Sequence, residues 1–149
     1  MASAFSGEAK VATTDILDRL KSAYAEWDRS KGDNKNMWFS VIADGIDFRS
    51  LGNPHAGIPW AVNCSSREQV RGYLDGLTDS FKMDYYTVER FVCQGDTVVV
   101  ICETAWTNRT TGKQAKTPKV DIWRFGPDGK AVAFHEYYDT AAVLQAAVA

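Results

Sequence analysis

The order of helical and strand patterns along the 149 residues constrains the fold more than any other feature of this sequence. Apolar residues recur at three-to-four spacing through the first half. From Met83 onward the pattern changes to alternating apolar and polar residues, separated by turns that contain glycine. Helices followed by a run of antiparallel strands are typical of α+β proteins, in which the helices cover one face of a sheet. The sequence therefore predicts an α+β domain.

The first half is expected to hold three helices and one short strand. Thr13 or Thr14 caps the first helix, and Asp15 lies favourably in its first turn. One apolar face of that helix is formed by Ile16, Leu17, Leu20, Tyr24 and Trp27. A short helix over 38–42, a strand over 46–51 and a helix that begins at a Ser65/Glu68 capping box follow.

Four strands and a closing helix are expected in the second half. The strands cover 85–92, 97–108, 115–125 and 130–138, and the helix covers 141–148. Between the strand over 46–51 and the helix that begins at Ser65 lies a loop of about a dozen residues, 52–63, and loops of that length are uncommon unless they have a function.

Composition excludes several classes of protein. Lys and Arg number 17 against 19 Asp and Glu, so the net charge of −2 provides no basic surface for nucleic acid. No apolar run approaches the length of a membrane span. Residues 1–12 lack the pattern of a secretory signal, and we expect them to be a flexible tail on a cytoplasmic protein. The two histidines and three cysteines have no metal-ligand spacing, and no nucleotide-binding motif occurs, so we expect neither metal nor cofactor.

The C-terminal half carries the most specific motifs, VDIWRF at 120–125 and FHEYYDTAA at 134–142, joined by a glycine-containing turn. With the helical first half, these motifs resemble the NTF2-like superfamily, which includes ketosteroid isomerases, SnoaL-like polyketide cyclases and limonene epoxide hydrolases. The resemblance implies a cone over residues 13–149, with helices packed on the concave face of a strongly curved antiparallel sheet. Because this fold carries many chemistries, it does not by itself fix a function.

Strand alternation places two acids on the expected concave face. Asp121 shares a face with Trp123 and Phe125, and Glu136 shares a face with Phe134 and Tyr138. Counting from the turn places Asp121 opposite Phe134 and makes the acids diagonal neighbours, about 7 Å apart. Desolvation and mutual repulsion then raise carboxyl pKa values, so one acid is expected to stay protonated and to donate a hydrogen bond or proton. The alternative is that Asp121 faces outward and pairs with Lys119 or Arg124.

The resemblance also points to residues beyond these acids. Tyr24 lies where the isomerases have a helix-borne oxyanion donor, so Asp121, Glu136 and Tyr24 are the candidate catalytic residues. Ser50 stands where the isomerases have their general-base Asp, and Thr104 where the epoxide hydrolases have charged residues, so both of those reactions are put in doubt. We expect Ser50 and Thr104 to contact a ligand, and His55 to lie at the mouth of the cone. His135 alternates with Glu136 and is expected to face away.

Aromatic residues are expected to form the remaining apolar wall of the pocket. These are Trp60, Trp106, Trp123, Phe125, Phe134 and Tyr138. The sequence therefore predicts a cofactor-free acid–base enzyme of the isomerase, cyclase, dehydratase or hydrolase type that acts on a small apolar oxygenated molecule, such as a polyketide, terpenoid or steroid-like compound. Two alternatives stay open: a ligand-binding or assembly module without catalysis, and a structural dimer whose cavity is filled by side chains. Apolar residues on the outer sheet face, such as Val99 and Ile122, predict a homodimer.

Overall fold

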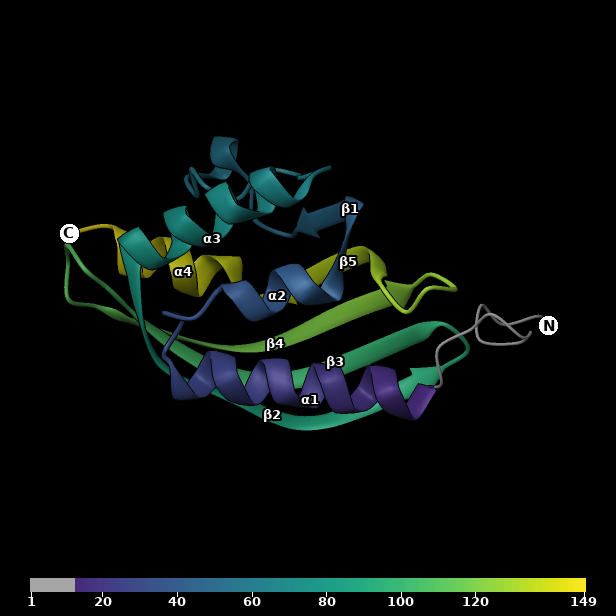
Figure 1. Cartoon of the computed structure of the whole chain (residues 1–149). Coiled ribbons are helices and arrows are strands. Elements are labelled where there is room, and N and C mark those ends of the chain that lie inside the picture. The colour runs from purple at the N-terminus through teal and green to yellow at the C-terminus, as the bar shows by residue number, and fades with distance from the viewer. Residues whose placement is uncertain (1–12) are drawn as a thin grey trace.

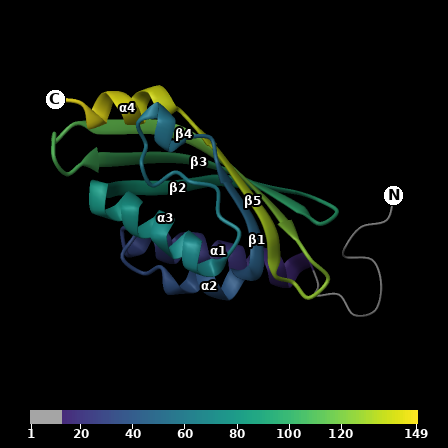
Figure 2. The ribbon, with the colours of Figure 1, turned by 90° about the horizontal axis from the view of Figure 1, so that it is seen from above.

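A computed structural model describes residues 13–149, and the tail predicted for residues 1–12 lies outside them. In chain order the elements are α1 (Thr13–Arg29), α2 (Asn36–Val41), β1 (Ile42–Ser50), η1 (Pro54–Ala56), α3 (Arg67–Ser80), β2 (Phe81–Gln94), β3 (Thr97–Asn108), β4 (Gln114–Phe125), β5 (Ala131–Tyr138) and α4 (Thr140–Ala147). The predicted order of helices and strands is confirmed, and α1 to α3 lie together on one face of a curled sheet (Figures 1 and 2).

The five strands form one open sheet in the order β1-β5-β4-β3-β2. Neighbouring strands from β2 to β5 are antiparallel, as expected for consecutive strands joined by short turns. β1 pairs with β5 in parallel, so the sheet is mixed and the prediction of a fully antiparallel sheet was wrong at this edge. Alternation reveals which residues share a face, but it carries no information on the direction in which two strands distant in sequence pair.

The curvature of the sheet has a local cause in β2. Its pairing with β3 shifts register between Met83 and Tyr85 and again between Val88 and Arg90. Such bulges bend a strand and increase its twist. The long strands β2, β3 and β4 therefore curl around the helices and form a cup (Figure 2).

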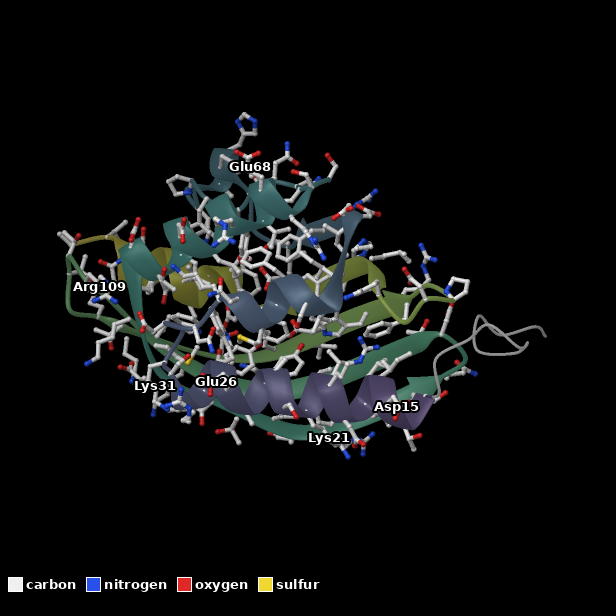
Figure 3. The ribbon with its side chains drawn as sticks, in the orientation of Figure 1. Asp15, Lys21, Glu26, Lys31, Glu68 and Arg109 are labelled. Carbon is white, nitrogen blue, oxygen red and sulfur yellow. The ribbon has the colours of Figure 1, made fainter. Side chains whose placement is uncertain are left out.

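Helix α1 covers one side of this cup. Its buried face follows the predicted spacing, with Ile16, Leu20, Tyr24 and Trp27 each at most 4% exposed. Two backbone hydrogen bonds close the C-terminal end of the helix, one from Lys31 N–H to the Asp28 carbonyl and one from Gly32 N–H to the Trp27 carbonyl. Charged side chains such as those of Lys21 and Glu26 project outward from the same helix (Figure 3).

Several element ends differ from the prediction, most of them by one or two residues. β1 begins at Ile42, which was expected to lie in the preceding helix, and β2 begins at Phe81, directly after α3. The cap of α3 is Ser66, whose side chain accepts from Gln69 N–H, one residue later than predicted. Among the described residues, no helix has the length and apolarity needed to cross a membrane.

Candidate active site

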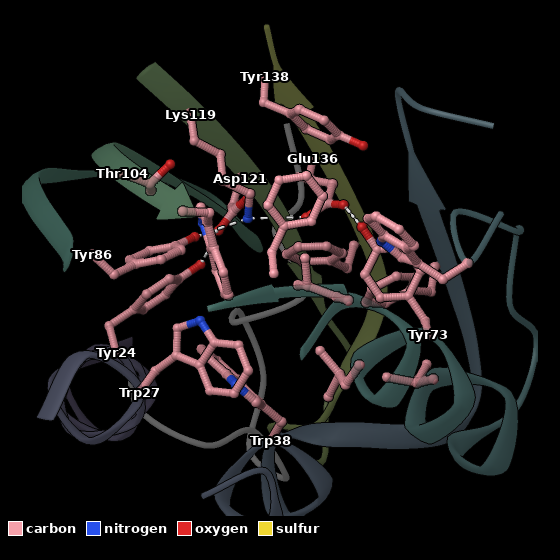
Figure 4. A pocket seen from close by; sticks show the side chains of 18 of the residues that line it. Tyr24, Trp27, Trp38, Tyr73, Tyr86, Thr104, Lys119, Asp121, Glu136 and Tyr138 are labelled. Atoms are coloured by element: carbon pink, nitrogen blue, oxygen red, sulfur yellow. Dashed lines mark hydrogen bonds and ion pairs between the residues drawn. The ribbon is translucent and has the colours of Figure 1, made fainter. Parts of the chain in front are cut away.

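The cup encloses a cavity of about 100 Å³ between the sheet and helices α1 to α3. Twelve of its lining side chains are aromatic: Tyr24, Trp27, Trp38, Phe48, Trp60, Tyr73, Phe81, Tyr86, Trp106, Trp123, Phe134 and Tyr138. Polar side chains reach it from β3, β4 and β5, namely Thr104, Thr117, Lys119, Asp121 and Glu136. The cavity is thus an apolar chamber with one cluster of ionisable groups on its sheet wall (Figure 4).

Both predicted acids face this chamber. The side chains of Asp121 and Glu136 are only 1% and 6% exposed. The two residues are direct partners across β4 and β5, and Trp123 pairs with Phe134. The diagonal arrangement expected from the sequence was therefore wrong, because the turn between the strands, with a register shift after Arg124, is longer than the simple count assumed.

Lys119 supplies the positive charge that this pair of acids needs. Its Nζ lies 2.8 Å from Asp121 Oδ1 and 3.0 Å from Glu136 Oε1. A third bond goes to the hydroxyl oxygen of Tyr86, at 2.8 Å. The ammonium therefore has two hydrogen-bond acceptors, Asp121 and Tyr86, and an ion pair with Glu136. Lys119 lies two residues before Asp121 on the same strand, so one strand holds the acid and its counterion on the same face.

Two tyrosines complete the surroundings of Asp121. The hydroxyls of Tyr24 and Tyr86 both donate to Asp121 Oδ2, at 2.6 and 3.1 Å. Tyr24 in turn accepts from the indole N–H of Trp123, at 2.8 Å. Three donors thus converge on Asp121, which is the arrangement of an ionised carboxylate that only accepts (Figure 4). The expectation that one acid of the pair stays protonated did not take Lys119 into account, and these three donors favour the ionised form of Asp121.

Glu136 is held by a different tyrosine and leads to a chain of hydroxyls. Tyr73 on α3 donates to Glu136 Oε2. The Tyr73 hydroxyl also lies 3.2 Å from Ser50 Oγ, which lies 3.1 Å from the Tyr138 hydroxyl. Tyr138 is partly exposed, so three hydroxyls connect the buried carboxylate to the edge of the chamber. Because Tyr73 gives its one hydrogen to Glu136, the chain is complete when Ser50 donates to Tyr73 and Tyr138 donates to Ser50. Tyr138, the last member, can turn its hydrogen from Ser50 to a ligand oxygen.

Burial shifts the pKa values of the groups in this cluster. It raises the pKa of Asp121 above its ordinary value, although Lys119 acts in the opposite direction. Burial alone would lower the pKa of Lys119, but the adjacent carboxylates, Asp121 foremost, outweigh it and hold the pKa well above its ordinary value. Burial and the nearby carboxylates raise the pKa values of Tyr24, Tyr73 and Tyr86, so these phenols stay protonated donors at neutral pH.

The aromatic wall is ordered by stacking. Trp38 from α2 stacks on Trp123 from β4, with ring centroids 5.7 Å apart and planes 17° apart. Phe48 and Phe134, on the paired strands β1 and β5, stack at 4.7 Å and 23°. These flat, parallel surfaces suit a flat or ring-shaped apolar ligand.

The rim of the chamber depends on a close approach between Trp60 and helix α3. A Cβ atom built on Gly76 would lie 2.4 Å from Trp60 Cβ, so only glycine allows the indole to lie against the helix at this point. Trp60 lines the chamber and is partly exposed. The loop that was expected to have a function therefore contributes one aromatic side chain, Trp60, to the wall of the chamber.

The structure brings most of the residues predicted to contact a ligand to the chamber. Trp60, Thr104, Trp106, Trp123, Phe134 and Tyr138 line it, as do the three predicted catalytic residues. Ser50 reaches it only through Tyr73 and Tyr138. Phe125 is buried in the core but does not line the chamber, and His55 is exposed on η1, away from it.

Three important residues were missed. Lys119 had a signal in the sequence, since alternation places it on the face of Asp121. Tyr73 was recognised only as an apolar position of α3, and Tyr86 only as part of a strand. Their partners lie 63 and 35 residues away, and no local pattern reveals such contacts. Within residues 13–149, no group of three or more His, Cys, Asp or Glu side chains is placed to hold a metal ion.

Comparison with known proteins identifies relatives of this chain. The family model described as the SnoaL-like domain matches residues 20–134. An NTF2-like protein of unknown function from Burkholderia pseudomallei superposes with a TM-score of 0.77 at 18% identity, covering 90% of this chain and 98% of that one. A Jannaschia protein named for the SnoaL-like polyketide cyclases gives 0.73 at 18% identity, with 94% and 96% covered.

A third solved structure carries a ligand. A protein with a ketosteroid isomerase-like fold from Catenulispora acidiphila, in complex with trimethylamine, gives a TM-score of 0.67 at 17% identity, with 91% of this chain and 94% of that one covered. At these identities the likeness concerns the fold. No curated protein matches the sequence.

Proposed function

Because this chain belongs to the SnoaL-like domain family, whose fold it shares with NTF2-like proteins, we propose that its chamber is the active site of an acid–base enzyme. Its substrate is a small, largely apolar molecule with an oxygen function, and the reaction is an isomerisation, cyclisation, dehydration or hydration that begins with removal of a proton. The observation that carries the proposal is Glu136, a buried carboxylate with unused acceptor capacity in an aromatic chamber.

Glu136 is the base in this proposal. Lys119 and Tyr73 each occupy one of its oxygens, and an ionised carboxylate has about four acceptor positions, so about two remain for a substrate. A base is effective when its proton acceptor is preoriented and shielded from water. The strand pairing with Asp121 and the bond from Tyr73 fix that orientation.

Tyr138 is the group that meets the oxygen on which negative charge develops. Burial raises its pKa, so the phenol keeps its hydrogen at neutral pH and can donate it. The hydroxyl chain through Ser50 and Tyr73 gives Tyr138 a hydrogen-bonded link to Glu136. Asp121, Tyr24 and Tyr86 hold Lys119 in place and act as positioning residues, because their bonds are directed within the cluster.

Size limits the substrate that enters without rearrangement. A cavity of about 150 Å³ holds one benzene molecule, and this one measures about 100 Å³. A single six-membered ring therefore already exceeds the closed volume, so a ring-shaped substrate requires Trp60 or Tyr138 to move outward, and a polycyclic one requires a larger movement.

Solvent exchange tests proton removal directly. The purified protein is incubated in D2O with cyclohexanone and 2-hydroxycyclohexanone, and loss of the α-proton signals is followed by proton NMR. We expect exchange faster than the buffer rate and a drop of at least 100-fold in Glu136→Gln, since a base contributes about 10² to 10⁴ in rate. Glu103→Gln, on the exposed side of β3, is the matched control and should exchange as the wild type does.

A chamber that binds these ketones without exchanging their protons would contradict the enzymatic proposal and favour a binding module. One observation gives that second function weight: the ammonium of Lys119 and the hydroxyls of Tyr24 and Tyr86 make their polar contacts within the cluster. Such saturation is typical of groups that stabilise a fold as well as of groups that prepare a site.

We also infer a homodimer formed through the outer sheet face. Val99 pairs with Ile122 and Ile101 pairs with Val120, and all four are only half-buried in the single chain. Val92 and Tyr137 continue this surface, with exposed fractions of 41% and 44%. A contiguous apolar patch of this kind is commonly covered by a partner.

A further inference from the structure

The hydrogen atoms of the polar cluster reveal which kind of ligand group it can accept. The cluster consists of Lys119, Asp121 and Glu136 with the hydroxyls of Tyr24, Tyr73 and Tyr86. Lys119 donates hydrogen bonds to Tyr86 and Asp121, and it forms an ion pair with Glu136. The three phenols give their hydrogens to the carboxylates. The donors of the cluster are therefore directed at acceptors within the cluster.

The acceptor positions of the two carboxylates are not all occupied. Asp121 receives three hydrogen bonds, and Glu136 receives one hydrogen bond from Tyr73 and an ion-pair contact from Lys119, whereas each ionised carboxylate offers about four acceptor positions. About one position on Asp121 and two on Glu136 remain. Glu136, at 6% exposed, is also the more accessible of the two carboxylates.

The net charge of the cluster also favours a ligand that donates a hydrogen bond. Two carboxylates and one ammonium sum to −1 in a chamber whose other walls are aromatic and apolar. A second negative charge brought into this low-dielectric space would be strongly repelled, whereas a hydrogen-bond donor would be attracted. A Tyr or Trp face also interacts favourably with positive charge.

We infer that the ligand of this chamber carries a hydrogen-bond donor, a hydroxyl or an amine, which it places on Glu136, and that ligands with an anionic group are rejected. This inference rests on the proposed function, for which it specifies the substrate class. It excludes carboxylic acids, phosphorylated compounds and acyl conjugates with a charged group inside the chamber. It favours alcohols, phenols, enols and amines that are otherwise apolar.

Four single-ring probes test the inference by fluorine NMR at pH 7.5. These are 4-fluorophenol, fluorobenzene, 4-fluorobenzoate and 4-fluorobenzylammonium. We expect 4-fluorophenol to bind at least tenfold more tightly than fluorobenzene, which lacks the donor, and at least tenfold more tightly than 4-fluorobenzoate. If the ammonium probe binds more tightly than the phenol, the preferred donor is a charged amine; if it binds less tightly, the preferred donor is a neutral hydroxyl.

Glu136→Gln connects this selectivity to the residue. The amide removes the charge and adds N–H donors, so we expect the preference for 4-fluorophenol over 4-fluorobenzoate to shrink at least fivefold. Glu103→Gln should leave the preference unchanged, because Glu103 is exposed on the outside of the sheet.

Equal binding of 4-fluorobenzoate and 4-fluorophenol would overturn the inference. So would failure of both donor probes to bind at millimolar concentration, or an unchanged preference in Glu136→Gln. These outcomes are distinct from failure of the proposed function, which is measured by deuterium exchange and would leave a donor-selective binding site intact.

Discussion

Replacing Lys119 by Met should change stability in a strongly pH-dependent way. The substitution leaves Asp121 and Glu136 as direct strand partners with no cation between them. It also removes the hydrogen bond to the Tyr86 hydroxyl. Breaking a buried ion pair by removing one partner costs about 3–5 kcal/mol, because the remaining charge is buried without compensation. That is a large share of the about 5–15 kcal/mol that stabilises a typical domain.

The sign of the pH dependence follows from the carboxyl groups. Burial raises the pKa of Asp121 and Lys119 opposes that rise, so without Lys119 the Asp121 carboxyl binds its proton more strongly in the folded state than in the unfolded state, where a carboxyl pKa is about 4. Stability then falls as pH rises, because the folded state holds more protons than the unfolded one. The deficit of Lys119→Met relative to the wild type should therefore be largest at pH 7 and should shrink as pH is lowered toward about 4.

Urea unfolding followed by circular dichroism at pH 7 and pH 5 measures this deficit. The double variant Lys119→Met/Glu136→Gln restores the net charge of −1 and should recover at least about 1 kcal/mol at pH 7, since one uncompensated charge is gone. It also keeps the comparison measurable if the single variant does not fold at pH 7. A stability deficit under about 1 kcal/mol, or one that is the same at both pH values, would refute the reasoning. Either result would mean that Lys119 is neutral in the wild type or that the carboxylates are solvated.

Three further predictions concern the rim, the tyrosines and the outer face. Gly76→Ala should displace Trp60 and destabilise the fold by about 1–3 kcal/mol, because the added Cβ overpacks the contact. Gly72→Ala lies on the same helix at a position where an added Cβ meets nothing within 4 Å, so it should stabilise the fold by about 0.5–1 kcal/mol. Thermal unfolding of the two variants measures both effects. Because the buried tyrosines have raised pKa values in the folded state, the protein should lose stability as pH rises above about 10. In an alkaline titration, their phenolate absorbance at 295 nm should therefore appear together with loss of helical circular dichroism. Absorbance that appears before unfolding would count against their burial. Ile122→Lys should convert the inferred dimer to a monomer in sedimentation velocity without loss of fold, and a monomeric wild type would show that the outer face has no such partner. The phenols that the alkaline titration follows are those of Tyr24, Tyr73 and Tyr86.

Alternation and helical spacing were sufficient to predict much of the fold. The buried face of α1 and the bounds of β3, Thr97–Asn108, agree with the sequence patterns because each depends on residues close in the chain. The same patterns placed Asp121 and Glu136 on the concave face, where both are buried.

The remainder depends on contacts that no local pattern encodes. The parallel pairing of β1 with β5 joins segments about 85 residues apart in sequence, such as Phe48 with Phe134. The direct pairing of Asp121 with Glu136 depends on a register shift next to the turn. The role of Lys119 required knowing that both carboxylates are buried on its own side of the sheet, since an exposed Lys beside an Asp is ordinarily a surface pair of little energetic weight.

The ionisation of Asp121 tests the central claim most directly, because the claim is that Lys119 allows two acids to stay ionised inside an apolar chamber. Carbon-13 NMR of the aspartate carboxyl groups, with the Asp121 signal assigned by its absence in Asp121→Asn, measures that ionisation as a function of pH. The account predicts the chemical shift of a carboxylate at pH 7 in the wild type and that of a protonated acid in Lys119→Met. A protonated Asp121 in the wild type at pH 7 would contradict it.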